Sequence, residues 1–398
     1  MLLPTRADFA DARRAPIKDL IAGITVAIVA LPLALAFGIG SGLGASAGLT
    51  TAIIAGAIAA IFGGSRLQVS GPTGAMTVVL VPIFHNFGAA GVLLVGLMAG
   101  VLLLFAAIAR FGEHIHKLPT SVIEGFTAGI AVIISLQQFT YLAGWLQAVF
   151  GLSVTGLILA GQHFWPRMPF AFIFVILATI VADISGMNLD RIGELPATVG
   201  HWDLAFLNQG NWLPLIPSAL AVTILAALES LLSAKVADRM RGGGEHHDAN
   251  KELFGQGIAN LVVPFFGGVP ATAALARTAV NVRSGATAKS SALIHSIVLA
   301  LVVLLAAPLV ARIPLAALAG VLLATTAHMV KPRELLHIAQ ISWLDAIVMV
   351  ATFIATVALN LISGVIIGLA LALGLRKTKL GRLSRTYPVV DDTETLGD

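Results

Sequence analysis

The stretch 70-SGPTGA-75 interrupts one long apolar run of the chain, and the stretch 269-VPATAA-274 interrupts another half a chain length later. Each follows a Phe-Gly-Gly triplet, 62-FGG-64 and 266-FGG-268. Proline suits the start of a helix because it lacks the N–H that would be left without a partner there, and small residues let backbone come close to a ligand. Each stretch is therefore predicted to be extended backbone that restarts as a short helix, and the matching positions indicate an internal repeat.

The composition predicts a membrane protein. Of 398 residues, 58% are hydrophobic and only 11% are charged, whereas soluble domains carry about 25% charged residues. Long unbroken apolar runs, such as 91–109 and 293–310, lack the alternation of a transmembrane β-barrel, so the spans are expected to be helices. The chain has no cysteine, which excludes disulfides and thiolate chemistry.

The apolar runs predict an all-α integral membrane protein with fourteen transmembrane segments in a 7+7 inverted repeat. The first repeat occupies residues 1–183, a polar connector 184–212, the second repeat 213–376 and a cytoplasmic tail 377–398. With seven spans per half, the second copy must be inverted in the membrane. Spans three and ten are expected to be short half-helices preceded by extended segments. The expected spans are 17–39, 47–62, 73–85, 88–110, 120–139, 145–160, 168–183, 214–236, 252–266, 271–281, 290–312, 314–330, 343–360 and 361–376.

The net charge of +4 and the pI near 9.6 do not indicate a nucleic-acid partner. The basic residues gather at the chain ends and in loops, where Lys and Arg mark the cytoplasmic side of a membrane. We therefore expect the lipid bilayer as a partner, no nucleic acid, and both termini in the cytoplasm.

The two interrupted stretches predict an anion site. The first N–H groups of a helix lack partners and carry the positive end of the helix dipole, so two helix starts that face each other can bind an anion without any cation. Thr73 and Thr272 would add hydroxyl donors, while Gly74, Ala75 and Ala273 would allow close approach of the backbone. The alternative is that both stretches are simple Pro/Gly kinks in packed helices, which is harder to reconcile with two kinks at matching positions of a repeat.

Charged residues inside the predicted spans are candidates for function. Arg277 would place a positive charge beside the anion; the alternative is an arginine that snorkels near a helix end. Glu229 and Ser233 share a helix face and could hold a sodium ion, or Glu229 could take up a proton; the alternative is a structural partner for Arg277 or Lys235. Phe37 could line the pocket with its ring edge, although phenylalanine in a span more often packs in the core.

Other candidates are weaker. His246, His247 and Asp248 lie in a Gly-rich polar loop that resembles a metal cluster only loosely, and a solvated loop is the better interpretation. Glu124 is expected to be a carboxylate at a helix N-terminus. Nucleophile elbows, phosphate loops and metalloprotease motifs do not occur in the sequence, so an enzyme is not expected, nor is a cofactor beyond a coupling Na⁺ or H⁺.

Several motifs, in order along almost the whole chain, resemble the SulP (sulfate permease) family of anion transporters. The most specific is 119-PTSVIEGFTAGI-130. The others are 31-LPLALAF-37, 71-GPTGAMT-77, 250-NKEL-253, 255-GQG-257 and 274-ALARTA-279.

The resemblance implies a core domain of spans one to four and eight to eleven, and a gate domain of spans five to seven and twelve to fourteen. It places the anion between the starts of spans three and ten, and the coupling cation at Glu229 and Ser233. It also implies a homodimer in the bacterial cell (inner) membrane. The residues expected near the anion are Phe37, Thr73, Gly74, Ala276 and Arg277.

Two departures from the family pattern stand out. Leu33 occupies a place where members often carry a polar residue, which puts substrate hydrogen bonding from the first span in question. Family chains usually continue into a STAS domain, whereas this sequence stops at Asp398 soon after its last span, as a truncated or a natural short form.

The sequence thus predicts a secondary active transporter of a small anion of the dicarboxylate, bicarbonate or sulfate class. Transport is expected to be coupled to a proton or sodium ion and to proceed by elevator-type movement of core against gate. One alternative is a nucleobase or ascorbate carrier of the same fold, which would be expected to offer a carboxylate in span ten where this chain has Arg277. The other is an anion channel, whose flux would not saturate.

Overall fold

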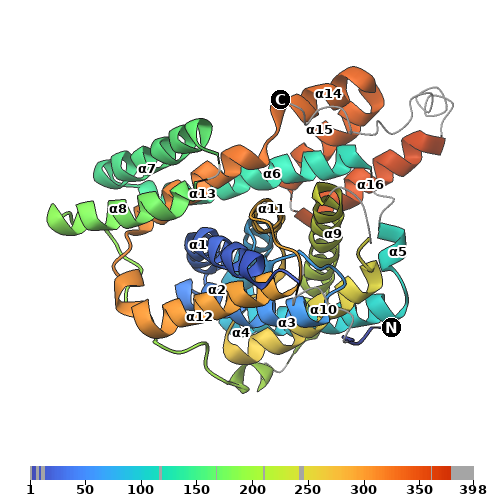
Figure 1. Ribbon diagram of the computed structural model, residues 1–398. Coiled ribbons are helices and arrows are strands. Elements are labelled where there is room, and N and C mark those ends of the chain that lie inside the picture. The colour runs from blue at the N-terminus through green and yellow to red at the C-terminus, as the bar shows by residue number, and fades with distance from the viewer. Residues whose placement is uncertain are drawn as a thin grey trace. The chain divides into compact units, whose positions relative to one another are not determined.

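The computed structural model describes residues 2–5, 9, 14–115, 119–166, 168–208, 211–241, 246–359 and 361–377. The chain divides into two compact units, one of residues 1–116 and 134–326 and the other of residues 117–133 and 327–398. Helices dominate both units (Figure 1).

The α-helices follow the apolar runs of the sequence. In chain order they are α1 (Pro16–Gly40), α2 (Ala45–Thr50), α3 (Gly56–Phe62), α4 (Gly74–Ile108), α5 (Gly112–Ile115), α6 (Thr120–Gln138), α7 (Trp145–Phe164), α8 (Phe170–Ile184), α9 (Ile216–Met240), α10 (Ala249–Val262), α11 (Leu275–Arg283), α12 (Ser290–Val310), α13 (Leu315–Met329), α14 (Pro332–Ile341), α15 (Trp343–Ala358) and α16 (Leu361–Lys377).

Short irregular turns complete the described secondary structure. A π-helical turn, η2 (Thr51–Ala55), joins α2 to α3. The 3₁₀ turns are η3 (Phe139–Leu142), η4 (Ala205–Asn208), η5 (Leu213–Leu215) and η6 (Val263–Phe266). Two strands, β1 (Ser70–Gly71) and β2 (Thr272–Ala273), pair antiparallel.

The described helices account for the fourteen predicted segments. Eight are long and apolar enough to cross a membrane, and the apolar stretches Phe170–Ile184, Trp343–Ala358 and Ser363–Leu375 are shorter. The helix α4 holds two segments, because Gly88 breaks it with non-helical angles (φ 67°, ψ −170°), between the expected spans 73–85 and 88–110. The remaining two segments are α10 and α11.

Two sequence expectations need correction. The segment expected at 271–281 begins as a helix only at Leu275, because residues 272–273 pair with β1 instead. Pro72 and Pro270 therefore lie in extended backbone rather than at the first helical position. Helix α14 lies between the expected spans 314–330 and 343–360, and none of its ten residues is buried.

Buried charges in the first unit cap helix ends. The Asp19 carboxylate of α1, fully buried, accepts hydrogen bonds from the N–H of Thr287 (2.6 Å) and from the hydroxyl of Ser290, at the start of α12. The Lys289 ammonium donates to the carbonyls of Gly63 (2.6 Å) and Ile61 (3.3 Å), at the end of α3. Both charges satisfy backbone groups that a helix leaves without partners, so these residues tie α1, α3 and α12 together.

The connector between the halves is anchored on two loops of the first unit. Arg191 pairs with Pro314 in an isolated β-bridge, next to the loop between α12 and α13. The Trp202 ring stacks on that of Phe265 with 5.1 Å between centroids, and the Asp203 N–H donates to the Phe265 carbonyl. The predicted division into core and gate domains stays a prediction.

Candidate functional site

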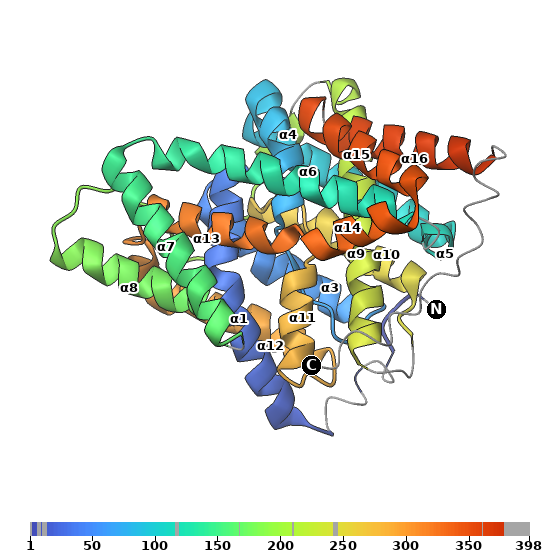
Figure 2. The ribbon, with the colours of Figure 1, turned by 90° about the horizontal axis from the view of Figure 1, so that it is seen from above.

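The two interrupted stretches meet. Strands β1 and β2 pair with Ser70 opposite Ala273 and Gly71 opposite Thr272. Helix α4 leaves the first strand and α11 leaves the second, and α11 packs between α1 and α9 (Figures 1 and 2). Because the strands are antiparallel, the starts of the two helices approach each other from opposite directions. The paired strands and the two helix starts that follow them are called the crossing below. The sequence predicted two facing helix starts of this kind for an anion site.

Side chains from α9 and α10 satisfy the extended backbone that flanks the strands. Asn260 donates to the carbonyl of Ala271 (2.9 Å) and accepts from its N–H (2.8 Å). Ser230 accepts from the N–H of Ala273 (3.2 Å), and Gln68 donates to the Ser230 carbonyl (3.0 Å). An unpaired backbone group is costly inside a membrane, so these contacts make the extended crossing possible there.

The start of α4 joins a cap to a carboxylate. The hydroxyl of Thr73, at the N-cap, accepts from the N–H of Met76 (3.3 Å) and donates to Oε2 of Glu229 (2.9 Å). Glu229 lies in α9 and is partly buried. The structure therefore brings these two predicted site residues into direct contact, although they are far apart in the sequence.

Arg277 lies beneath the crossing. Its side chain is 1% exposed, and Nη2 donates to the carbonyl of Pro72. Nη1 has no hydrogen-bond partner among the described residues, and it packs against Gly71, where a Cβ atom would lie 2.2 Å from it. The guanidinium is therefore held by the first strand and does not snorkel toward water. It interacts electrostatically with Glu229.

Phe37 and Gly74 also lie together. A Cβ atom on Gly74 would be 3.1 Å from Cε1 of Phe37, and the Phe37 carbonyl accepts from the hydroxyl of Thr77 (3.3 Å). The ring edge of Phe37 therefore borders the start of α4. Ala75 and Ala273 are buried, whereas Ala276 is exposed at the start of α11.

Two predicted hydroxyls face elsewhere. Thr272 is fully buried, and its hydroxyl contacts that of Ser230 (3.0 Å) and donates to the carbonyl of Ala226 (3.2 Å). Ser233 donates to the hydroxyl of Thr278 (3.0 Å) rather than to Glu229. Both hydroxyls form hydrogen bonds between α9 and the β2–α11 segment. Their predicted roles in substrate and cation binding stay predictions.

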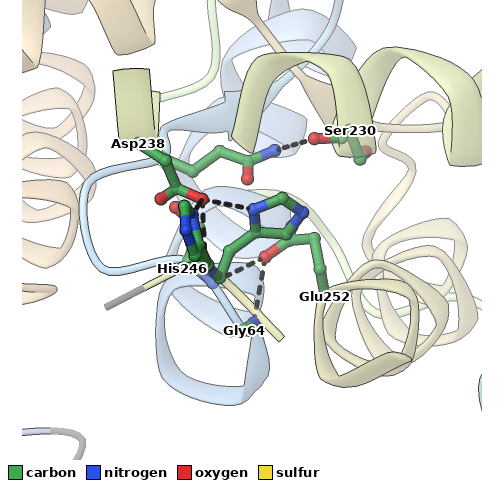
Figure 3. Close-up of polar contacts among 8 residues, drawn as sticks. Gly64, Ser230, Asp238, His246 and Glu252 are labelled. Atoms are coloured by element: carbon green, nitrogen blue, oxygen red, sulfur yellow. Dashed lines mark hydrogen bonds and ion pairs between the residues drawn. The ribbon is translucent and has the colours of Figure 1, made fainter. Parts of the chain in front are cut away.

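A second polar cluster lies at the C-terminal end of α9 (Figure 3). The carboxylate of Glu252 accepts from the N–H groups of Gly64 (3.0 Å) and Ser65 (3.1 Å), before β1. Asp238 contacts Nδ1 of His247 at 2.6 Å, while His246 is largely exposed. Within the described part of the chain no group of His, Asp and Glu residues could hold a metal ion. In the loop that loosely resembled a metal cluster, His247 instead pairs with Asp238 at the end of α9.

Sequence reasoning missed the polar residues that support the crossing. They share a signal, a polar side chain in an otherwise apolar span, but hydropathy alone does not say what each one contacts. They are Gln68, Ser230, Gln256, Asn260, Thr278 and Asn281.

Comparisons with known proteins agree with the fold. The chain matches the model of the sulfate permease family over residues 17–146 and 143–352. It is 37% identical to the putative sulfate transporter YvdB of Bacillus subtilis, over 95% of this chain and 77% of that protein. It is 32% identical to the bicarbonate transporter BicA of Picosynechococcus, over 94% of this chain and 73% of that protein.

Solved structures give the same result. The transmembrane domain of a cyanobacterial bicarbonate transporter BicA matches with a TM-score of 0.81 and 31% identity, over 90% of this chain and 98% of that chain. SLC26A9 matches with a TM-score of 0.82 over 92% of this chain and 66% of its own, at 16% identity, which shows the shared fold alone. The predictions of a multi-pass membrane protein with a fourteen-segment inverted repeat are confirmed, and the chain belongs to the sulfate permease family of anion transporters.

Proposed function

We propose that this protein is a secondary active transporter that binds one small oxyanion or carboxylate between the starts of α4 and α11. The observation that carries the proposal is Arg277, a buried guanidinium that is fixed to the first strand and keeps one N–H group unpaired among the described residues. A buried positive charge beside two helix starts is a strong attractor for an anion, because the helix N–H groups supply further donors.

Relatives name the substrate class. YvdB is described as a putative sulfate transporter and BicA as a bicarbonate transporter. Sulfate, bicarbonate and a dicarboxylate such as fumarate all present oxygen acceptors that helix N–H groups and a guanidinium can bind. A nucleobase carrier is less compatible with Arg277, since a base presents N–H donors that call for a carboxylate.

Glu229 is proposed to couple transport to a cation. It is bonded to Thr73 at the start of α4 and interacts electrostatically with Arg277. A proton or sodium ion at Glu229 would therefore change the charge at the anion site directly. Movement of a core domain against a gate domain, as an elevator, and assembly as a homodimer belong to the same proposal.

Anion binding can be tested with purified protein in proteoliposomes. Uptake of labelled bicarbonate, sulfate and fumarate should saturate, and Arg277→Gln should raise the KM of the transported anion at least about tenfold, because a charge-assisted hydrogen bond is lost. Unchanged KM in this variant, or flux that rises linearly with voltage without saturation, would remove the transporter proposal.

Coupling needs a separate test. Glu229→Gln should still exchange labelled for unlabelled anion, but it should no longer accumulate anion under a proton or sodium gradient. Ser218→Ala, in the first turn of the same helix, serves as the matched control and should leave both activities intact. If Glu229→Gln accumulates anion as the parent protein does, Glu229 has no part in coupling.

A further inference from the structure

A buried histidine near the first strand has no role assigned so far. His295 is in α12 and is fully buried. Neither ring nitrogen has a hydrogen-bond partner of normal geometry among the described residues, although the ring interacts with the carbonyl of Ala292, one turn earlier. A buried polar group without a partner is costly and is rare in folded proteins, so its presence needs a reason.

The first strand places His295 and Arg277 on the same side of the crossing. A Cβ atom on Gly56 would lie 3.2 Å from the Ser70 carbonyl and 3.9 Å from Cε1 of His295. A Cβ atom on the next strand residue, Gly71, would lie 2.2 Å from Nη1 of Arg277 and 3.3 Å from Cα of Ala52. Ala52 and Gly56 are one turn apart on the second span, so the imidazole and the guanidinium lie one helical turn apart along this span, beside consecutive residues of the first strand.

The local chemistry of the two side chains is complementary. A neutral imidazole carries one nitrogen that donates and one that accepts, whereas a guanidinium only donates. Nη1 of Arg277 is an unpaired donor and His295 offers an unpaired acceptor, among the residues that the structure describes. The two side chains interact electrostatically. A second positive charge at this place would be buried without a partner, so the imidazole is expected to be neutral.

Small residues on the second span let the first strand and α12 come close to it. Its π-helical turn, η2, ends at Ala55, directly before Gly56, where a Cβ atom would lie 2.9 Å from the hydroxyl of Ser296 and 3.2 Å from the Ser70 carbonyl. The hydroxyl of Ser296 is directed to the carbonyls of Ala52 and Ala292, both at 3.4 Å, and so does not compete for the imidazole.

We propose that His295 is a positioning residue for the anion site: its unprotonated ring nitrogen accepts a hydrogen bond from Nη1 of Arg277, directly or through one water, and so fixes the guanidinium against the first strand. The anion then meets a guanidinium whose orientation is already set, which lowers the cost of binding. This inference rests on the proposed function, in which Arg277 supplies the charge.

The test compares substitutions that keep or remove the acceptor. His295→Leu should raise the KM for the transported anion about tenfold with little change in kcat, since the guanidinium keeps its charge but loses its orientation. His295→Gln, which restores an acceptor, should recover most of the affinity. Ser296→Ala, the neighbouring buried position, should change KM less than about twofold. If His295→Leu does not fold, His295→Phe replaces it, with a ring but no nitrogen.

The coupling to Arg277 is tested by a double-mutant cycle. Arg277→Lys keeps the charge and removes Nη1, so adding His295→Leu to it should change anion affinity by less than about twofold. An unchanged KM in His295→Leu, or an equal loss in the Arg277 and Arg277→Lys backgrounds, would overturn the inference.

The same set of variants separates the two proposals. If Arg277→Gln and Arg277→Lys both leave the affinity unchanged, the proposed anion site fails. If they weaken it and the histidine variants do not, only the positioning role fails.

Discussion

The two halves of the repeat build the same crossing from different parts. In the first half, α4 begins with a side-chain cap from Thr73, and its first residues are buried and uncharged. In the second half, α11 begins at Leu275 after the N-cap residue Ala274, which makes no side-chain cap; its first two residues are exposed, and it carries the buried Arg277. Both halves therefore place a helix start after a short strand, but their side chains differ. The first half supplies a hydroxyl and close packing, and the second supplies a positive charge.

The supports of the two strands differ in the same way. Asn260 satisfies both the N–H and the carbonyl of Ala271 before β2. Gln68, before β1, donates once, to the carbonyl of Ser230 in α9, and its own carbonyl oxygen has no partner within the described residues. Both polar backbone groups of Ala271 therefore depend on Asn260, whereas the hydrogen bond of Gln68 goes to a helix and not to strand backbone.

The largest expected effect follows from that dependence. Asn260→Leu should lower the free energy of unfolding by about 2–6 kcal/mol, because two buried backbone groups lose their partners at ~1–3 kcal/mol each. Gln68→Leu should cost about 1 kcal/mol, since only one hydrogen bond, to a helix carbonyl of α9, is lost. Thermal unfolding in detergent measures both variants. Equal losses in the two variants would show that the strands are supported alike.

The close packing of the first half gives the second prediction. Gly71→Ala should weaken anion binding about tenfold or more, because the new Cβ atom would lie 2.2 Å from Nη1 of Arg277 and force the guanidinium away. Gly88→Ala is the control, since Gly88 also has a positive φ but nothing lies within 4 Å of its Cβ position. Anion-induced thermal shifts report binding for both. A Gly71→Ala protein with parental affinity would show that the guanidinium can move to another position without loss of anion binding.

Particular residues show what the sequence could and could not predict. The break near Gly88 and the two extended stretches were predictable, because glycine and proline act locally. The late start of α11 at Leu275 was not, since residues 272–273 pair with a strand from the other half of the chain. The contact of Thr73 with Glu229 could not be predicted either, because it joins residues from the two halves of the chain. Thr272 resembled a substrate donor by its type and position, but its hydroxyl is used by Ser230 and Ala226 of α9.

His295 marks a different limit of sequence reasoning. One histidine in a span gives no pattern, and its importance depends on a neighbour, Arg277, in another helix. Hydropathy predicts where the spans are, whereas the fit of polar groups between spans depends on tertiary packing.

The smallest expected effect comes from the caps. Ala274 has extended angles (φ −102°, ψ 116°), which suit an N-cap residue, so Ala274→Ser should add a hydrogen bond to the start of α11 and stabilise the protein by about 0.5–1 kcal/mol. Thr73→Val should cost about 1–2 kcal/mol, since α4 loses its cap and Glu229 loses a donor, while Thr73→Ser should be close to the parent protein. Thermal unfolding measures all three.

The anion affinity of Ala274→Ser then tests why the second half lacks a cap. A serine cap would occupy an N–H group that the uncapped helix leaves for the anion, so affinity should fall by about two- to fivefold while stability rises. A variant that gains stability and keeps full affinity would show that the start of α11 takes no part in binding, and that the division of chemistry between the halves rests on Arg277 alone.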